Sequence, residues 1–159
     1  MRFWKKPETC SGEGVVMENI KLVIVSPDGT LYNGAADFIK IRTINGDIGI
    51  RGKHANYFSV ISFAECMVEN AEETKYAACS DGYISVKNKS EVKIVATTFE
   101  WAEIIDSKRA QRAYENAQQM LESIDNKNKD YRRYQDKLKR AQIRIKIANS
   151  NLSERIVKH

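Results

Sequence analysis

Charged side chains gather in one short stretch of the chain, and their types are those that bind small anions. Glu100, Glu103 and Asp106 precede Lys108 and Arg109. Arginine suits phosphate oxygens because its planar guanidinium offers paired donors and keeps its charge, whereas a carboxylate accepts hydrogen bonds from a base or a ribose. This stretch is therefore the first candidate for a small-ligand site or a conformational switch.

The simplest explanation of the same residues needs no ligand. Asp106 has the character of a helix N-cap, because its side-chain oxygen can accept a backbone N–H of the first helical turn. Arg109 would then be a solvated residue one turn further on. Spacing alone favours this explanation, so a ligand site requires further partners.

Two amphipathic helices are expected after this stretch. Apolar and small residues recur there at three- and four-residue intervals, which is the helical period. The first stripe consists of Ala110, Ala113, Ala117, Met120 or Leu121, and Ile124, and the second consists of Tyr131, Tyr134, Leu138, Ala141, Ile145 and Ala148. Residues 125–128 form a polar break between them, and such a short connection favours an antiparallel hairpin.

The hairpin brings two more arginines toward the charged stretch. Residues equidistant from the break face each other, so Arg140 and Arg144 lie within about one turn, roughly 5.4 Å of axial rise, of Arg109. We expect these three arginines to be able to hold phosphates together. Glu100 and Asp106 would accept hydrogen bonds from a base or a ribose at the same place.

The part of the chain before the helices has the pattern of a half-buried sheet. Apolar residues mostly alternate with polar ones, and turn signals such as Pro27-Asp28-Gly29 and Asn45-Gly46 interrupt them. The expected strands cover residues 20–25, 31–32, 38–44, 58–68, 76–80, 83–87 and 92–97. We expect 58–68 to be one long strand covered on both faces, and Asp81-Gly82 to separate two strands. Short strands at regular spacing indicate a sandwich or a small barrel.

Net charge restricts the partners that the chain could meet. The formal charge is +5; residues 129–148 alone carry +6, with eight Lys or Arg against Asp130 and Asp136, and the remainder sums to −1. A basic helix is most often a solvated face, but this one, with Tyr131 and Tyr134 among its charges, could also meet RNA or an acidic protein. The pattern alone does not choose between these partners.

The sequence offers little for catalysis or metal binding. His54 and His159 are the only histidines, and neither a GxxxxGK[ST] loop nor a GxGxxG loop occurs. Three cysteines without metal-ligand spacing argue against a disulfide framework or a zinc site and fit a reducing, cytosolic compartment. We expect no catalytic residue and no metal site. The glycine-rich run 46–54 is better explained by tight turns beside a sheet edge, with His54 as a loop-anchoring residue.

The expected organisation has four parts. Residues 1–16 are interpreted as a flexible leader, because glycine and proline occur there without a sustained period. Residues 17–99 form a β domain, residues 100–149 form the hinge and the helical hairpin, and residues 150–159 form a tail. No apolar run approaches the length of a membrane span, so any membrane association would come through partners.

Four groups of residues, in this order and spacing, form a specific combined signal. They are Pro27-x-Gly29 with Tyr32-x-Gly34, Gly46-Asp47-Ile48-Gly49-Ile50 followed by His54, Gly82-Tyr83-Ile84-x-Val86, and Ile105-Asp106-x-x-Arg109-Ala110. Together they resemble the epsilon subunit of the bacterial F-type ATP synthase, from Glu18 to the end of the second helix. The resemblance implies a flattened antiparallel β-sandwich followed by an antiparallel two-helix hairpin, which agrees with the division inferred from the periodicities.

The resemblance also implies a noncatalytic subunit of the rotary central stalk. Its β-sandwich would dock on the gamma subunit and the membrane c-ring, so that a proton or sodium gradient drives ATP synthesis. The docking loop would contain Gly46, Asp47, Gly49 and His54. The hairpin would alternate between a folded form and an extended form that reaches the alpha and beta subunits and inhibits ATP hydrolysis. Such a subunit is a peripheral membrane protein at the cytoplasmic face of the bacterial membrane, attached only through the complex.

Some members of this family bind ATP on this subunit, where it holds the hairpin folded; no other cofactor is implied. The resemblance places ATP contacts at Glu100, Ile105, Asp106, Arg109, Ala110, Arg140 and Arg144. One family arginine, ten residues after the motif aspartate, is replaced here by Asn116, and Arg112 one turn earlier is a candidate substitute. Weak or absent ATP binding is therefore an open alternative.

Two functions of other classes are further alternatives. A basic RNA-binding β-barrel predicts tight, steeply salt-dependent RNA binding, although the β half lacks the exposed aromatic and basic residues of a stacking platform. A stand-alone enzyme would need His54 as its base, and the sequence suggests no substrate pocket. We therefore expect protein partners and no nucleic acid.

Overall fold

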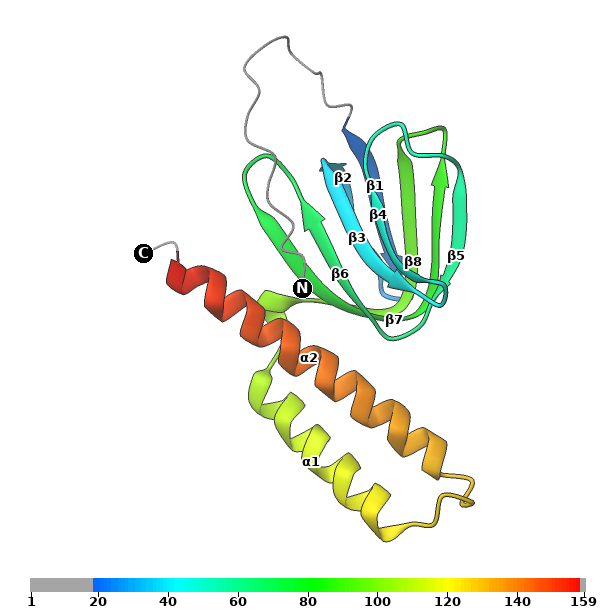
Figure 1. Ribbon diagram of the computed structural model, residues 1–159. Coiled ribbons are helices and arrows are strands. Elements are labelled where there is room, and N and C mark those ends of the chain that lie inside the picture. The colour runs from blue at the N-terminus through cyan, green and yellow to red at the C-terminus, as the bar shows by residue number, and fades with distance from the viewer. Residues whose placement is uncertain (1–18, 158–159) are drawn as a thin grey trace, which may run out of the picture.

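The computed structural model of the chain describes residues 19–157, with side chains through residue 150. A strand-rich half comes first, and a short 3-10 helix and two α-helices follow it (Figure 1). The strands are β1 (Ile20–Ser26), β2 (Gly29–Ala36), β3 (Phe38–Thr43), β4 (Gly46–Ile50), β5 (Tyr57–Ile61), β6 (Ala64–Glu69), β7 (Thr74–Lys87) and β8 (Glu91–Trp101). The helices are η1 (Ala102–Ile104), α1 (Ser107–Ser123) and α2 (Tyr131–Val157). The predicted division into a β half and a helical hairpin is confirmed, and the predicted leader lies outside the described residues.

The strands form one sheet that folds over into two layers (Figure 1). Its order is β2-β1-β8-β7-β6-β3-β4, and β5 pairs with β7 outside this path. The long β7 pairs with β6 through residues 74–79 and with β5 through residues 82–86. All pairs are antiparallel except β1 with β8, which is parallel. The expected antiparallel sandwich is therefore confirmed, with one parallel pair.

Alternating apolar residues fill the space between the layers. In β1, Ile20, Leu22 and Ile24 are fully buried, while the residues between them are less buried. The same alternation runs along β3 and most of β8, because successive side chains of a strand point to opposite faces. Full burial of one such side chain contributes about 1.5–3 kcal/mol, so the alternation stabilises the domain.

Two motif glycines are required by the backbone. Gly46, at the turn between β3 and β4, has a φ of 114°, which strains any residue with a Cβ. At Gly82, an added Cβ would lie 1.9 Å from the carbonyl oxygen of Val95. Glycine therefore permits the close approach of β7 and β8 at this point.

The expected long strand over residues 58–68 is wrong. A break at residues 62–63 separates β5 from β6 and changes the parity of burial. Ile61 is buried in β5, whereas Phe58 and Val60 are 64% and 45% exposed. The break is needed because β5 and β6 pair with different halves of β7.

The expected separation of two strands at Asp81-Gly82 is also wrong, because β7 continues through it. Asp81 has a positive φ of 36°, and the hydroxyl of Thr97 donates a hydrogen bond to its carbonyl oxygen at 2.9 Å. Ser80 and Gly82 remain paired with β8 on either side. The motif therefore perturbs a continuous strand rather than ending it.

The first helix begins as predicted at an N-cap. Asp106 has an extended backbone, and its Oδ1 accepts a hydrogen bond from the backbone N–H of Arg109 at 3.0 Å. Ala110 and Ala117 are buried along the hairpin, whereas Ala113 is exposed. The predicted apolar stripe of this helix is therefore wrong at Ala113, which instead borders an open pocket.

The second helix makes contacts on two sides, which the stripe pattern did not predict. One side of α2 meets α1, and the other meets β7 and η1, so that α2 lies between α1 and the sheet (Figure 1). Ile147 is fully buried there in a small apolar cluster with Ala78 and Ala102. The helix continues beyond this cluster into the segment that was interpreted as a tail.

Candidate anion-binding pocket at the hinge

A pocket of about 640 Å³ lies where the end of β8, η1, α1 and α2 meet. It is lined by Glu100, Ile104, Ile105, Asp106, Arg109, Ala110, Ala113, Lys137, Arg140, Ala141 and Arg144. Every residue assigned to ATP binding from the sequence is among them. The fold thus brings together side chains of the last strand, the hinge and both helices.

Glu100 and Arg144 form a two-point ion pair at this pocket. Nε and Nη2 of Arg144 donate to Oε2 and Oε1 of Glu100 at 2.7 and 2.8 Å. The side chains of Arg144 and Glu100 are 30% and 34% exposed, so water screens the pair only in part. The hydrogen-bonded carboxylate raises the pKa of the Arg144 guanidinium. The pair joins the last strand of the sheet to α2.

Arg140 is held toward β7. Its Nη2 donates to Oδ2 of Asp81 at 3.3 Å, and its guanidinium carbon lies 4.3 Å from the centroid of the Phe63 ring. A charged partner and an aromatic face together orient a guanidinium group. Two of the three predicted arginines therefore already have carboxylate partners while the hairpin is folded.

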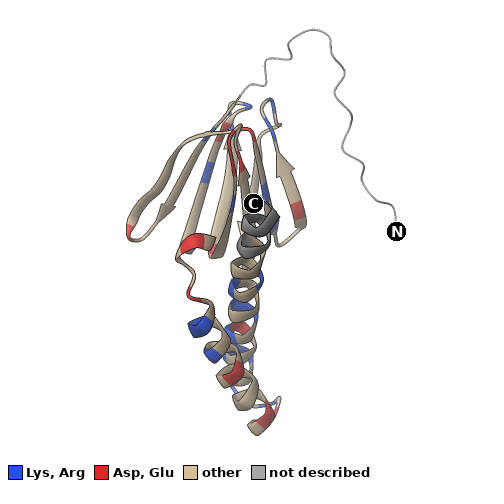
Figure 2. Cartoon of the chain, turned by 90° about the vertical axis from the view of Figure 1, so that its left-hand side faces the viewer, with Lys and Arg blue, Asp and Glu red and all other residues tan. Residues whose placement is uncertain are grey.

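The other two cationic residues of the pocket, Arg109 and Lys137, have no carboxylate partner among the described residues. Arg109 is exposed, and neither Arg109 nor Lys137 forms an ion pair with another residue that the structure describes. Lys and Arg lie on both helices of the hairpin (Figure 2). The pocket is lined by four cationic and two acidic side chains, an excess of two positive charges that suits a phosphate-bearing anion.

The site residues predicted from the sequence did not include Lys137, which lines the pocket. It stands three positions before Arg140 and seven before Arg144, so the spacing places all three on one face of α2. Asn116 and its candidate substitute Arg112 are exposed on α1 and do not line the pocket. In the folded hairpin Arg112 therefore lies outside the pocket, and its role as a substitute for the family arginine stays a prediction.

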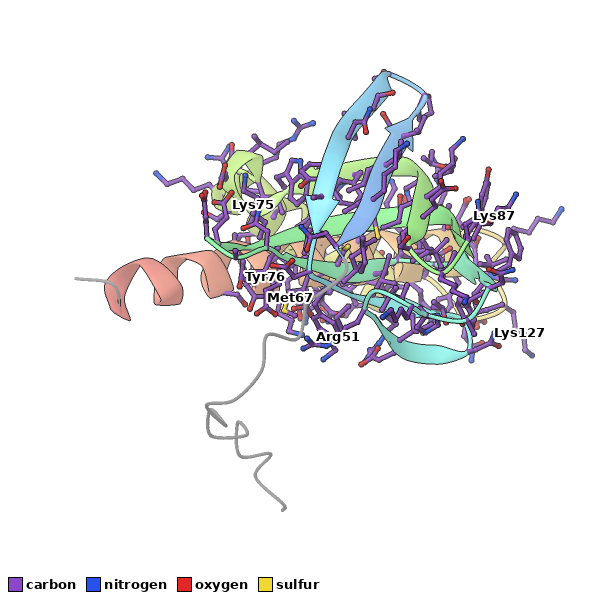
Figure 3. All side chains as sticks on the ribbon, turned by 90° about the horizontal axis from the view of Figure 1, so that it is seen from above. Arg51, Met67, Lys75, Tyr76, Lys87 and Lys127 are labelled. Atoms are coloured by element: carbon purple, nitrogen blue, oxygen red, sulfur yellow. The ribbon has the colours of Figure 1, made fainter. Side chains whose placement is uncertain are left out.

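A second hollow, of about 420 Å³, lies where the outer face of β3, β4 and β6 meets α2. Lys146 of α2 pairs there with Glu65 of β6. Met67 and Tyr76, labelled near each other in Figure 3, are paired across β6 and β7 and also line it. The Lys146–Glu65 pair is a third ionic contact between α2 and the sheet.

The predicted docking residues Gly46, Asp47 and Gly49 all lie on β4. Nε and Nη2 of Arg42, on the neighbouring β3, donate to the Asp47 carboxylate at 2.7 and 3.3 Å. These hydrogen bonds lower the pKa of Asp47. At Gly49 an added Cβ would lie 2.9 Å from the ring of Phe38, so β3 and β4 are closely packed at this point.

His54, the fourth predicted docking residue, lies in the loop between β4 and β5. Its Nδ1 lies 2.7 Å from the carbonyl oxygen of Ala55 and can donate a hydrogen bond to it. Its ring meets Tyr57 edge-on, with 6.3 Å between the centroids. These contacts agree with the loop-anchoring role expected from the sequence.

An exposed apolar patch lies beside this loop, on β5, β7 and the turn between β3 and β4. Its members, which we call the β5 patch, are Phe58 and Val60 of β5, Tyr83 of β7 and Ile44 of the turn. The rings of Phe58 and Tyr83 are 5.4 Å apart, and the Ile44 N–H donates to the Val60 carbonyl oxygen at 3.1 Å. Contiguous exposed apolar residues of this kind mark sites of protein contact.

The described part of the chain contains no cluster of metal-ligand residues and no exposed thiol. No group of three His, Cys, Asp or Glu could hold a metal among residues 19–150. Cys66 and Cys79 are free and buried, and burial raises the pKa of Cys79 to about 12, so its thiol is unreactive. None of the described helices is long and apolar enough to cross a membrane.

The fold and the pocket define a class of protein: a β-sandwich carrying a helical hairpin, with a basic pocket where the two halves meet. The family model of the ATP synthase delta/epsilon chain β-sandwich domain matches residues 19–102, and that of the long alpha-helix domain of the same chain matches residues 103–149. The chain therefore belongs to the ATP synthase delta/epsilon chain family, and the resemblance found in its motifs is confirmed.

Curated relatives carry the same assignment. The ATP synthase epsilon chain of Shouchella clausii is 31% identical over 132 residues, which cover 83% of this chain and 96% of the relative. That of Mycoplasmopsis pulmonis is 29% identical over 133 residues, covering 83% and 94%. A chain in the cryo-EM structure of the Euglena gracilis mitochondrial ATP synthase, OSCP/F1/c-ring, matches with a TM-score of 0.69 over 88% of each chain. At 22% identity, this likeness concerns the fold alone.

Proposed function

We propose that the chain is the epsilon subunit of the central stalk of an F-type ATP synthase, a noncatalytic subunit that couples rotation to ATP synthesis and regulates ATP hydrolysis. Its family membership supports the assignment to the synthase. The observation that carries the regulatory role is the convergence of Glu100, Arg109 and Arg144 in one pocket, since these residues come from the sheet, α1 and α2.

ATP bound in this pocket would stabilise the folded hairpin. Its phosphates would contact Arg109, Arg140 and Arg144, while Glu100 and Asp106 would accept hydrogen bonds from the base or the ribose. The walls of the pocket come from β8, η1, α1 and α2, so the complete site exists only while the hairpin is folded. ATP would therefore bind the folded form more tightly and shift the equilibrium toward it.

The extended form would expose the basic face of α2. Extension breaks three ion pairs between α2 and the sheet, namely Arg144–Glu100, Arg140–Asp81 and Lys146–Glu65. It also uncovers Ile147. The released cations could then meet acidic surfaces of the alpha and beta subunits, where the hairpin would inhibit ATP hydrolysis.

The β half would dock on the gamma subunit and the c-ring. The contact region would have three parts. They are the β3–β4 hairpin with Gly46, Asp47 and Gly49, the loop with His54, and the adjacent β5 patch. An apolar patch beside a charged hairpin supplies both affinity and orientation. The subunit would then lie at the cytoplasmic face of the bacterial membrane, attached only through the complex.

Truncation of the chain after Ile105 tests the regulatory role. The shortened chain keeps all eight strands and η1 and loses both α-helices. In the reconstituted synthase we expect coupling to persist and ATP hydrolysis to rise. Unchanged hydrolysis by the truncated complex would contradict an inhibitory hairpin.

A calorimetric titration of the isolated protein with ATP tests the ligand. Saturable binding that is lost in Arg109→Ala and Arg140→Ala would support an ATP sensor at the hinge. Absence of binding into the millimolar range would refute ATP sensing but not the family assignment. The hairpin would then respond to rotation or to ion-motive force.

A further inference from the structure

Lys137 lines the hinge pocket on the same wall as Arg140 and Arg144. The three residues stand three and four positions apart on α2, which is the spacing of one helical face. An anion that reaches the two arginines is therefore within range of the lysine as well. No motif of the chain gave this lysine a role.

The four cations of the pocket differ in what already holds them. Arg144 makes two hydrogen bonds to Glu100, and Arg140 pairs with Asp81. A phosphate group that approaches these arginines must compete with a carboxylate in each case. A phosphate that approaches Arg109 or Lys137 breaks no ion pair among the described residues.

Lys137 can move toward a ligand at small cost. Its Nζ lies 5.0 Å from the centroid of the Tyr134 ring, one turn earlier on α2, and both side chains face solvent at least in part. A cation–π contact at an exposed site is weak, and the lysine side chain has a flexible four-carbon stem. The ammonium group can therefore exchange the ring for a phosphate oxygen.

We propose that Lys137 is a phosphate-binding residue of the hinge pocket. Together with Arg109 it makes the first contacts to the phosphate chain of a nucleoside triphosphate, before Arg140 and Arg144 exchange their carboxylate partners. This inference rests on the proposed function of the pocket as an ATP site.

Ligand binding and hairpin closure thus depend on different residues of α2. Arg144 and its partner Glu100 hold α2 on the sheet without a ligand, whereas Lys137 contributes no ion pair to the folded form. Loss of the lysine should therefore weaken the ligand and leave the ligand-free hairpin folded. Loss of Arg144 should affect both properties.

The test is calorimetric titration of the full chain with ATP and, separately, with inorganic triphosphate. The variants are Lys137→Ala, the conservative Lys137→Arg, and Lys139→Ala. Lys139→Ala is the matched control. It removes the same charge from the same helix, at a position about 200° around the helix axis from Lys137. Circular dichroism of each variant checks that the helix content is unchanged.

We expect Lys137→Ala to weaken the binding of both ligands about fivefold to tenfold. Lys137→Arg should bind like the wild type, and Lys139→Ala should change affinity less than about twofold. Two results would overturn the contact of Lys137 with phosphate but leave ATP sensing standing. One is an equal loss of affinity in Lys137→Ala and Lys139→Ala, and the other is a loss of affinity for ATP without a loss of affinity for triphosphate. A wild-type chain that binds neither ligand would overturn both this inference and ATP sensing.

Discussion

Replacing Glu100 by glutamine should loosen the folded hairpin and leave the sheet intact. Glutamine keeps the shape of the side chain but removes its charge and one of its two acceptor oxygens. The two-point contact with Arg144 then becomes a single hydrogen bond to a neutral acceptor. The change therefore acts on the junction between β8 and α2.

The expected size of the effect follows from the exposure of the two side chains. A hydrogen bond to a charged group is worth about 1.5–3 kcal/mol, whereas an exposed ion pair is worth about 0–1 kcal/mol. With side chains 34% and 30% exposed, the Glu100–Arg144 pair lies between these cases. We expect Glu100→Gln to destabilise the docked hairpin by about 1–2 kcal/mol, which raises its opening constant roughly fivefold to thirtyfold.

Native-state hydrogen exchange of the α2 amides around Ile147 measures this opening in the nucleotide-free protein. Asp81→Asn is the matched control, because Arg140 contacts Asp81 once, at 3.3 Å, and the two side chains are 43% and 53% exposed. The control should cost less than about 0.5 kcal/mol. A cycle with Arg144→Gln and the double variant should give a coupling free energy of about 1 kcal/mol.

Equal acceleration of exchange by Glu100→Gln and Asp81→Asn, or a coupling free energy close to zero, would contradict a dominant role of the Glu100–Arg144 pair. Equal effects would mean that the two ion pairs hold α2 on the sheet to the same extent, and a coupling free energy close to zero would mean that the Glu100–Arg144 pair does not hold it there. Faster exchange throughout the strands would show instead that the substitution damages the β half.

Three further predictions concern stability. Gly82→Ala places a Cβ 1.9 Å from the Val95 carbonyl oxygen and should lower the free energy of unfolding by about 3 kcal/mol or more; an unchanged urea midpoint would contradict the close approach. Ile147→Ala should cost about 2–5 kcal/mol locally, seen as faster exchange in α2 while the β half keeps its urea midpoint. Arg42 lowers the pKa of Asp47 in the folded state, so the carboxylate stabilises the fold above its unfolded pKa, and this stability is lost as the pH falls through the folded pKa. Asp47→Asn should therefore make the free energy of unfolding depend less on pH below about pH 4. If the pair contributes nothing, urea unfolding from about pH 5 to 2 would give the same slope of this free energy against pH for the wild type and the variant.

Local patterns predicted most of the β half because alternation decides which face of a strand is buried. Such patterns could not predict the break at residues 62–63, because Ser62-Phe63 contains no glycine, proline, asparagine or aspartate. The break exists because β7 is long enough to pair with β5 and β6 in succession. Asp81-Gly82 has turn chemistry, yet its strand continues because β8 supplies partners on both sides. Pairing between distant strands decided both cases.

The sequence predicted most of the charged residues that line the candidate site, with the exception of Lys137, but it did not predict their contacts. Helical spacing and the turn between the helices placed Arg140 and Arg144 near Arg109. The Arg144–Glu100 pair spans 44 residues and depends on how α2 sits on the sheet, which is fixed by the apolar cluster around Ile147. Ile147 lies outside the stripe that was used to orient α2, so sequence spacing could not give that contact.

The parallel pairing of β1 with β8 gives the two halves of the molecule different folding routes. Lys21 stands beside Glu91 and Val25 beside Val95, so partners in this pair are about seventy residues apart along the chain. Closing so long a loop has an entropic cost that only the completed sheet offsets, whereas α1 and α2 meet across a short turn. During synthesis β1 can pair with β2 early, but its pairing with β8 requires that β8 has been synthesised, and the helices follow β8 in the chain. The hairpin is thus the last part to form and the first that can leave, since no strand depends on it for a partner.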